Sequence, residues 1–449
     1  VSLLWAAGAE EVEEAFNKAI KTTMEEMQQF AQTRVRIGSG DNQMDEQRFT
    51  GNLVWASFVH DTARPVKHAD GSVTVDPHLH AHVYVHNLTY DPVEDEWKAL
   101  KNNAIVRKND YWEARFDSLF SRELYRKGIQ VERRGKSFDI FGLSPTAIAP
   151  FAQRTKQVNE VARTLGITGK KKAELGALTR EAKSLAKDID LKEHIQERAP
   201  ATFQRLQSIR GAMLQILPTV SEYGPLDEQG RKELAAEAIQ YALDKALERK
   251  ATTTMYGLYA DAQRYAGAAQ CLIDEDIYQA FEAREDIILG EVDKWGDVRL
   301  TTELVVAQEV RLLEIVREGR DKLEPVVKRP RLSRQLSSAQ HAALTHILSS
   351  KDQFMLLRGQ AGTGKSFALE HLVRELERND ICPVALAPTA SASRGALREA
   401  KIHDANTLAK FLGPSRTGQG LRHQAKNGLI ILDEAGLAGT EDMLKLAEA

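Results

Sequence analysis

The sequence predicts a three-part fold: an α+β domain with an antiparallel sheet and helices, a helical connecting region, and an α/β lobe. Apolar and histidine side chains alternate over residues 77–86, as in a strand with one buried face. Residues 151–325 are charged, rich in alanine and largely of helical periodicity. A short apolar run at residues 354–358, interpreted as a strand, then leads into a glycine-rich turn and a helix.

The chain is long enough for about three domains, and we place them at residues 1–200, 201–330 and 331–449. The formal net charge of −3 means that any nucleic-acid-binding surface must be local. No apolar run reaches membrane-spanning length and no basic-then-apolar leader is visible, so we expect a cytoplasmic location. The sequence opens without Met and stops inside an apparent helix, so we interpret it as an internal piece of a larger protein.

The first domain begins with helical periodicity over residues 10–34 and continues with a buried strand over residues 53–60. A turn-rich insert at residues 65–77 separates this strand from the histidine-rich one. Two strands joined in this way are expected to be antiparallel neighbours.

The histidine-rich strand carries the first candidate site. One of its faces carries five side chains, those of His78, His80, His82, Tyr84 and His86. Neutral imidazole is a favoured ligand for divalent transition metals, and two imidazoles at i and i+2 can bind one ion. His60, at the end of the neighbouring strand, is the natural third ligand.

A solvated strand face is the alternative interpretation, because a single surface histidine usually binds nothing. Four histidines on one face of one strand favour a metal site whose open coordination positions polarise a phosphate oxygen. The spacing alone does not distinguish a nuclease from a metal-dependent oxygenase.

Three segments resemble motifs of the MobF-type (TraI/TrwC-like) conjugative relaxases, namely Phe58–Arg64, Asp76–His82 and Trp97–Asn102. The resemblance implies a relaxase domain of the HUH endonuclease fold at the start of the chain. It also implies that a divalent metal is bound by three ligands, His60, His80 and His82. Mg²⁺, Mn²⁺ and Zn²⁺ are the candidate ions. His78 is not a ligand position in the family, so it is either a neighbour of the ligands or an alternative ligand.

In such relaxases the metal polarises the scissile phosphate of single-stranded DNA at a plasmid transfer origin, and a tyrosine near the N-terminus attacks it. That tyrosine would precede Val1, so we expect the piece alone not to cut DNA. The resemblance also implies relaxosome accessory proteins and a type IV coupling protein as partners, without membrane insertion.

A basic segment follows at residues 101–136, with ten Lys/Arg against five Asp/Glu. Arg107 and Lys108 are its candidate DNA contacts. The aromatic side chains of this segment either stack on bases or turn inward beneath a solvated helix face; these are Tyr111, Trp112 and Phe116.

The last domain carries a phosphate-binding loop, Gly359-Gln360-Ala361-Gly362-Thr363-Gly364-Lys365-Ser366. All eight residues are candidate ATP ligands: backbone N–H groups hold the phosphates, Lys365 meets the β and γ oxygens, and Ser366 meets Mg²⁺. A second apolar strand at residues 428–432 ends in Asp433 and Glu434. We assign Asp433 to the Mg²⁺ of ATP and Glu434 to the attacking water of ATP hydrolysis. A glycine-rich turn and an unrelated acidic loop are the alternative.

This domain also resembles the RecD-like branch of superfamily-one helicases. Gln340 resembles their adenine-reading glutamine, and Thr389 and Arg394 lie in a segment like their single-strand-contacting one. Residues Ala405–Leu408 resemble a further element of that branch. The resemblance implies the first RecA-like lobe of a 5′-to-3′ DNA helicase, truncated before its second lobe, so we expect ATP binding without unwinding.

The leading functional prediction is part of a bifunctional conjugative relaxase–helicase that nicks one strand at a transfer origin and unwinds the plasmid with ATP. A rolling-circle replication or transposition protein with the same histidine pair is the enzymatic alternative. A non-catalytic remnant that binds single-stranded DNA or ATP is the alternative of another class.

Overall fold

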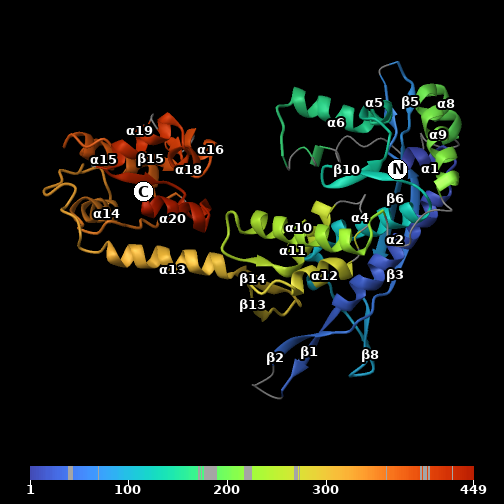
Figure 1. Cartoon of the computed structure of the whole chain (residues 1–449), viewed down its shortest axis with the longest axis horizontal. Helices are drawn as coiled ribbons and strands as arrows, with labels where there is room; N and C mark the ends of the chain where they lie inside the picture. The colour runs from blue at the N-terminus through green and yellow to red at the C-terminus, as the bar shows by residue number, and fades with distance from the viewer. Residues whose placement is uncertain are drawn as a thin grey trace. The chain divides into compact units, whose positions relative to one another are not determined.

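The computed structural model describes residues 1–38, 44–68, 70–169, 172, 174–175, 190–216, 225–266, 272, 274–360, 362–394, 397, 402, 405–426 and 428–449. Its contacts divide the chain into two compact units. The first unit contains Val1–Leu243, Thr254–Glu285 and Glu291–Val298. The second contains Asp244–Thr253, Asp286–Gly290 and Arg299–Ala449. Figure 1 shows the elements of both units in chain order.

The first unit is built around two long helices, α2 (Glu11–Met27) and α4 (Asn109–Arg126), which pack against each other. Acidic residues in the first turn of α2 complement its helix dipole. The helix ends earlier than predicted, because a short 3₁₀ turn (Gln28–Phe30) and strand β1 (Gln32–Ile37) take up the rest of residues 28–37. The alternating β-branched side chains of β1 favour an extended chain and explain the difference.

Further helices complete the first unit and the connecting part of the chain. They are α1 (Ser2–Ala6), α3 (Asn103–Val106), α5 (Pro145–Ile148), α6 (Gln153–Thr164), α8 (Leu191–Arg198), α9 (Pro200–Ile216), α10 (Glu228–Leu247), α11 (Met255–Ala266) and α12 (Asp274–Glu282).

The strand pair that carries the histidines is β3 (Trp55–Thr62) with β6 (Pro77–Val85), and it is antiparallel as predicted. The insert between these strands forms its own small hairpin, β4 (Val66–Lys67) with β5 (Val73–Thr74). Gly71 lies at the tip of that hairpin with a φ of +85°. A conformation of that kind favours glycine, which has no Cβ to clash with its own backbone.

The remaining strands form small sheets. One has the order β2 (Met44–Phe49), β1, β9 (Leu100–Lys101), and Figure 1 shows the β1–β2 hairpin and β8 projecting from the first unit. Two further antiparallel pairs are β7 (Thr89–Asp91) with β8 (Glu96–Lys98), and β10 (Val131–Arg134) with β11 (Ser137–Ile140). A three-stranded sheet has the order β12 (Thr253–Thr254), β14 (Val298–Thr302), β13 (Ile287–Val292).

The core of the first unit lies between the helices and one face of the β3–β6 pair. Its fully buried side chains include Leu4, Leu119, Leu124, Ile140, Ile195 and Leu206. Three apolar residues of β6 pack against this core: Leu79 is buried, and Ala81 and Val85 are partly buried, whereas Val83 is 37% exposed. Burial of one face leaves the opposite, histidine-bearing face of the same strands outside the core.

The second unit has an α/β arrangement with a parallel sheet of order β16 (Asn406–Thr407), β15 (Val384–Ala387), β17 (Ile430–Leu432). Its helices are α13 (Glu303–Glu318), α14 (Ser338–Ser349), α15 (Lys365–Glu377), α16 (Ala390–Arg394), α18 (Leu408–Leu412), α19 (Arg416–Ala425) and α20 (Thr440–Glu448). A separate apolar core joins α14 and α15 to β15 and β17. The predicted α+β and α/β classes are confirmed.

One predicted strand of the second unit does not form. Residues 354–358 lie within the described part of the chain but have no strand pairing, and Leu356 is 90% exposed. A strand is stabilised by hydrogen bonds to a neighbour, and the described sheet contains only β16, β15 and β17. Among the described residues, no helix combines the length and the apolar character needed to cross a membrane.

Candidate functional site

The structure brings the three predicted metal ligands together on the face of the β3–β6 pair that points away from the core. His60 lies directly opposite His80 in the antiparallel register, and His82 follows two residues later on the same face. The ring centroids are 5.4 Å apart for His60 and His80, and 5.1 Å apart for His60 and His82. Those of His80 and His82 are 5.3 Å apart. Two strands thus hold three imidazoles in one cluster, which we call the histidine cluster.

The chemistry and spacing of the histidine cluster fit a divalent metal ion. Three imidazoles that bind one ion at about 2.0–2.1 Å and near-tetrahedral angles have ring centroids roughly 5 Å apart. The planes of the His60 and His80 rings are inclined by 25°. No group of three or more His, Cys, Asp or Glu in the described ranges stands ready to hold an ion. Binding of an ion by these three rings would therefore require them to reorient.

His78 lies beside the cluster and contacts His80 in two ways. The two rings stack with centroids 4.5 Å apart and planes inclined by 24°. The backbone carbonyl oxygen of His78 lies 2.8 Å from Nδ1 of His80. Because a carbonyl oxygen only accepts, this contact requires a proton on Nδ1 of His80, and in a neutral ring the free lone pair is then on Nε2.

Strand β6 is anchored at its first residues. Asp76 is buried, accepts a hydrogen bond from the backbone N–H of Gln153 at 2.7 Å, and pairs with Arg198 at 3.0 Å. The backbone N–H of Leu79 donates to Oγ of Ser2 at 3.0 Å. The only sign of these anchors in the sequence is that an acidic residue precedes the proline at the start of the histidine-rich strand. The partners of this acidic residue lie far away in the chain, so the sequence does not reveal them.

The exposed face continues beyond the histidine cluster with aromatic side chains. Phe58 lies opposite His82 in the register and is 58% exposed. Tyr84 is 59% exposed and meets His86 edge-on, with centroids 4.8 Å apart. This part of the face is therefore open to a ligand.

The basic segment places its predicted DNA contacts differently from expectation. Lys108 is only 2% exposed, and its Nζ donates to the carbonyl oxygen of Trp295 at 2.6 Å. Its burial lowers the pKa of the ammonium group. The guanidinium of Arg107 lies over the Trp295 ring, 3.6 Å from its centroid. Lys108 is therefore not accessible to DNA, because its ammonium group is buried and donates a hydrogen bond to a backbone carbonyl oxygen.

The aromatic residues of the basic segment turn inward. Trp112 is 4% exposed and packs against Phe30, with centroids 5.5 Å apart. Tyr111 packs against Tyr256, and Phe116 joins the core of the first unit. Of the two interpretations of these side chains, the inward one is confirmed.

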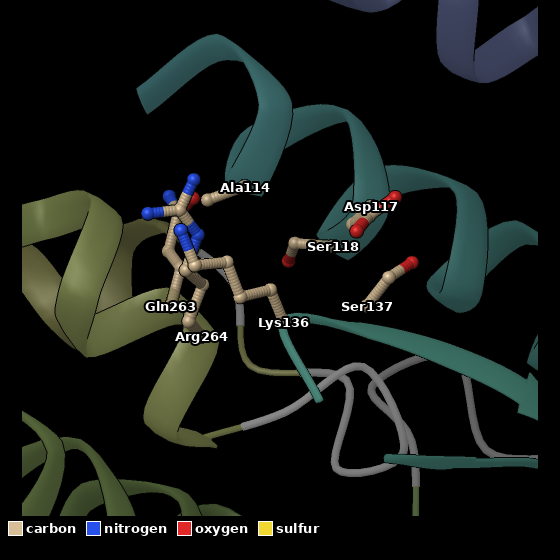
Figure 2. A pocket seen from close by; sticks show the side chains of 7 residues that line it. All are labelled: Ala114, Asp117, Ser118, Lys136, Ser137, Gln263 and Arg264. Carbon is tan, nitrogen blue, oxygen red and sulfur yellow. The ribbon is translucent and has the colours of Figure 1, made fainter. Parts of the chain in front are cut away.

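Figure 2 shows a small cavity beside α4. It has a volume of about 10 Å³ and is lined by Ala114, Asp117, Ser118, Lys136, Ser137, Gln263 and Arg264. The space admits about one water molecule and is far too small for a nucleotide. Burial raises the pKa of the Asp117 carboxyl to about 6, although Ser137 donates a hydrogen bond to it.

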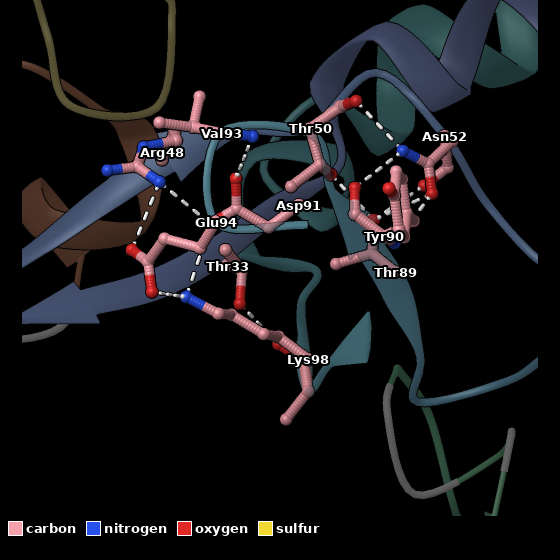
Figure 3. Close-up of polar contacts among 11 residues, drawn as sticks. Thr33, Arg48, Thr50, Asn52, Thr89, Tyr90, Asp91, Val93, Glu94 and Lys98 are labelled. Atoms are coloured by element: carbon pink, nitrogen blue, oxygen red, sulfur yellow. Dashed lines mark hydrogen bonds and ion pairs between the residues drawn. The ribbon is translucent and has the colours of Figure 1, made fainter. Parts of the chain in front are cut away.

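A polar network holds the β7–β8 hairpin at the start of the Trp97–Asn102 segment (Figure 3). Asp91 is completely buried and pairs with Arg48 at 2.8 Å and with Lys98 at 3.2 Å. It also accepts from the backbone N–H of Val93 at 3.0 Å. Burial opposes its ionisation, but the hydrogen bonds from Val93, Arg48 and Lys98 outweigh it and hold the pKa of Asp91 below its ordinary value. This network is structural.

The phosphate-binding loop leads directly into helix α15. Gly364 precedes the helix with a φ of +75°, a backbone conformation that favours glycine, and an added Cβ would also displace Nε2 of Gln340, which would lie 2.8 Å away. Nζ of Lys365 donates to the carbonyl oxygen of Gly359 at 2.9 Å. Oγ1 of Thr363 donates to the carbonyl oxygen of Gln360 at 2.8 Å. A backbone carbonyl of the loop thus accepts from the lysine of the same loop.

The other predicted nucleotide residues occupy the same region. Ser366 is the second residue of α15, and Gly362 has a φ of +80°. Ala361 lies outside the described residues. Gln340 forms a capping box with Ser337 and donates from Nε2 to the carbonyl oxygens of Thr363 at 3.1 Å and Gly364 at 3.3 Å. Gln340 therefore touches the loop itself.

The acidic pair follows β17 as predicted. The backbone N–H of Asp433 donates to the carbonyl oxygen of Leu386 in the neighbouring strand at 3.0 Å. Glu434 adopts a left-handed backbone conformation with a φ of 52°. Thr389 directly precedes α16, and Arg394 is the last residue of that helix, with its side chain outside the described part of the structure.

Two family models match the chain. The TrwC relaxase model matches residues 1–202, and the AAA domain model matches residues 335–449. The Multifunctional conjugation protein TraI of Escherichia coli (strain K12) is 30% identical over 224 residues, which cover 47% of this chain and 12% of that protein. A second TraI of Escherichia coli is 28% identical over 233 residues, covering 49% and 13%. The chain thus spans only a small part of the length of these relatives.

Solved structures of the conjugative relaxase TrwC are similar to this chain at low TM-scores. The metal-free complex with oriT DNA has a TM-score of 0.38 and 29% identity, covering 45% of this chain and 67% of that chain. A copper-bound complex has a TM-score of 0.38 and 27% identity, covering 46% and 67%. The family models thus assign a TrwC relaxase domain to residues 1–202 and an AAA domain to residues 335–449.

Proposed function

We propose that this chain is part of a conjugative relaxase–helicase and that the histidine cluster is the metal centre of its nicking site. The observation that carries the proposal is the convergence of His60, His80 and His82 within the span that matches the TrwC relaxase model. The curated relatives are named multifunctional conjugation proteins, which supports a role in plasmid transfer.

In the proposed reaction, the imidazoles of His60, His80 and His82 would hold a divalent ion, which would supply polarisation of an oxygen of the scissile phosphate of single-stranded DNA. A tyrosine hydroxyl of the full-length protein attacks the phosphorus. The reaction forms a 5′-phosphotyrosine bond and breaks the bond to the 3′ oxygen, which leaves as a 3′-hydroxyl. The residues of this chain bind and orient the phosphate, and the Asp76 anchor keeps β6 in place beneath it.

For the second domain, we propose ATP binding in the loop Gly359–Ser366 and ATP-driven 5′-to-3′ unwinding by the full-length protein. Lys365 stabilises charge on the β and γ phosphates, Ser366 and Asp433 hold Mg²⁺, and Glu434 orients water. The AAA match supports this assignment. Single-stranded DNA is the proposed substrate of both domains, with relaxosome accessory proteins and a type IV coupling protein as partners.

Covalent capture of DNA tests the nicking proposal. The full-length product of the gene is incubated with Mn²⁺ and a labelled single strand that carries the transfer origin of its plasmid. We expect a covalent protein–DNA adduct that survives denaturing electrophoresis. A His80→Ala/His82→Ala variant should lose the adduct together with bound metal, because two of the three imidazoles are gone.

His86→Ala is the matched control, since it removes an exposed histidine from the same strand face outside the cluster, and it should retain the adduct. An undiminished adduct in the double variant contradicts the metal centre. Cutting at a replication origin but not at a transfer origin favours the rolling-circle alternative. Binding of DNA by the parent without any adduct favours the non-catalytic one.

A further inference from the structure

We propose that His78 is a positioning residue whose ring and backbone hold the imidazole of His80 in the orientation that binds the metal ion. The inference rests on the proposed function, because it assigns a role beside the proposed metal centre. His78 supplies a fourth imidazole beside the cluster. It is not one of the three proposed metal ligands, and it is not a ligand position in the family that the sequence resembles.

The backbone contact determines which nitrogen of His80 is available. A histidine that binds a metal through one ring nitrogen usually donates a hydrogen bond from the other, which fixes the tautomer and the ring orientation. The carbonyl oxygen of His78 accepts this bond from Nδ1 of His80 at 2.8 Å. Nε2 is then the nitrogen with the free lone pair, and it lies at the far end of the ring.

The ring contact restricts how His80 rotates. The second side-chain torsion of histidine has broad energy wells, so a ring on an open strand face samples many orientations. His80 instead has two near-parallel neighbouring rings: His78 at 4.5 Å with 24° between planes, and His60 at 5.4 Å with 25°. His78 provides the closer contact. The stacked ring and the carbonyl oxygen of His78 together hold His80 in one orientation.

Two substitutions separate positioning from ligation. His78→Ala removes the stacked ring and keeps the backbone carbonyl, whereas His78→Phe keeps a flat ring that cannot bind a metal. Isothermal titration of the full 449-residue chain with Zn²⁺ alone measures the affinity. We expect His78→Ala to weaken Zn²⁺ binding by roughly 10-fold to 100-fold, as for other residues that orient a metal ligand. His78→Phe should stay close to the parent.

A spectroscopic readout reports on His80 directly. Nitrogen NMR of the ¹⁵N-labelled imidazoles distinguishes a ring protonated on Nδ1 from one protonated on Nε2. In the metal-free parent and in His78→Phe, we expect the His80 signal of the Nδ1-protonated form. In His78→Ala, we expect exchange between both forms, because the released ring leaves the carbonyl oxygen. His86→Ala, on the same face, should change neither the NMR signal nor the affinity.

Each contrary outcome has a separate meaning. If His78→Phe binds Zn²⁺ as weakly as His78→Ala, His78 is a ligand and the positioning role is wrong. If His78→Ala matches the parent in affinity and in tautomer, His78 plays no part. If the parent binds no Zn²⁺, the proposed metal centre fails, while the NMR comparison of the metal-free proteins still decides the role of His78.

Discussion

Asp117 is a carboxyl group whose burial works against folding at neutral pH. It lies on α4 beside the small cavity, and its pKa is raised to about 6 in the folded protein. An unfolded aspartate has a pKa of about 3.9, so the unfolded chain loses this proton first as the pH rises. The contribution of Asp117 to stability is therefore fully present below about pH 4 and lost as the pH rises through about 6.

Asp117→Asn should remove this penalty, because an amide stays neutral and its oxygen still accepts a hydrogen bond from Ser137. We expect the free energy of unfolding to rise by about 1–2 kcal/mol at pH 7.5 and to stay close to the parent at pH 4. Urea unfolding at both pH values measures the difference. Asp110→Asn on the same helix, where the side chain is 78% exposed, is the matched control. A gain of equal size at both pH values would contradict the assigned cause.

At the scale of the residue, the sequence indicated well which side chains could take part in chemistry. It indicated poorly which side chains are accessible to a ligand. The alternation that gathers His60, His80 and His82 is local and can be read directly. The burial of Lys108 depends on the carbonyl of Trp295, and that of Arg115 on an ion pair with Asp274 at 2.7 Å. Such partners are remote in the chain, so counting basic residues could not identify them.

At the scale of the element, strand β6 depends on the ion pair between Asp76 and Arg198, whose side chains are only 6% and 17% exposed. Asp76→Asn should leave Arg198 without its counter-charge. We expect the free energy of unfolding to fall by about 2–3 kcal/mol and Zn²⁺ binding to weaken, because the start of the histidine strand loosens. Denaturant unfolding and titration with Zn²⁺ measure the two effects.

Asp70→Asn is the control for that substitution, since Asp70 is an exposed acid that bonds only locally to Ser72 at 2.6 Å. It should leave metal affinity unchanged. Loss of stability in Asp76→Asn without any change in Zn²⁺ affinity would mean that the anchor supports the unit but not the site.

The elements differ in how well the sequence predicts them. Strand β6 and helix α15 have strong local patterns, and both form. The apolar run at residues 354–358 resembles a strand, but pairing depends on a neighbour that the run itself does not specify. The helix was predicted to continue to residue 34, but α2 ends earlier. No glycine or proline separates the hydrophobic stripe of α2 from the alternating pattern of β1, so the sequence does not mark the end of the helix.

At the scale of the molecule, the two units have separate cores and should unfold in two separate transitions. A ligand that binds one unit should shift the transition of that unit alone. A ligand that binds only the folded state stabilises by about 2.7 kcal/mol at 100 times its dissociation constant. We therefore expect Zn²⁺ to raise the midpoint of one thermal transition and Mg²⁺–ATP that of the other. Calorimetry of the 449-residue chain measures both.

Lys365→Ala should abolish the shift caused by ATP and retain the shift caused by Zn²⁺, and His80→Ala/His82→Ala should do the reverse. A single transition that responds to both ligands would mean that the units unfold as one.

The order of domains follows from motifs, but the limits of the connecting region stay a prediction. Contacts such as Gln32 with Lys294 at 2.8 Å join residues that no local pattern relates.

The β4–β5 hairpin offers a place to attach a reporter without disturbing chemistry. Pairing of β3 with β6 aligns the histidines through the strands themselves, so the length of the insert between them is free to vary at its tip. A Cβ added at Gly71 would meet no atom within 4 Å, which leaves open space around that position. Loop tips of this kind tolerate insertions. A peptide tag or fluorophore inserted after Gly71 would allow the protein to be followed while the paired strands β3 and β6 stay as they are.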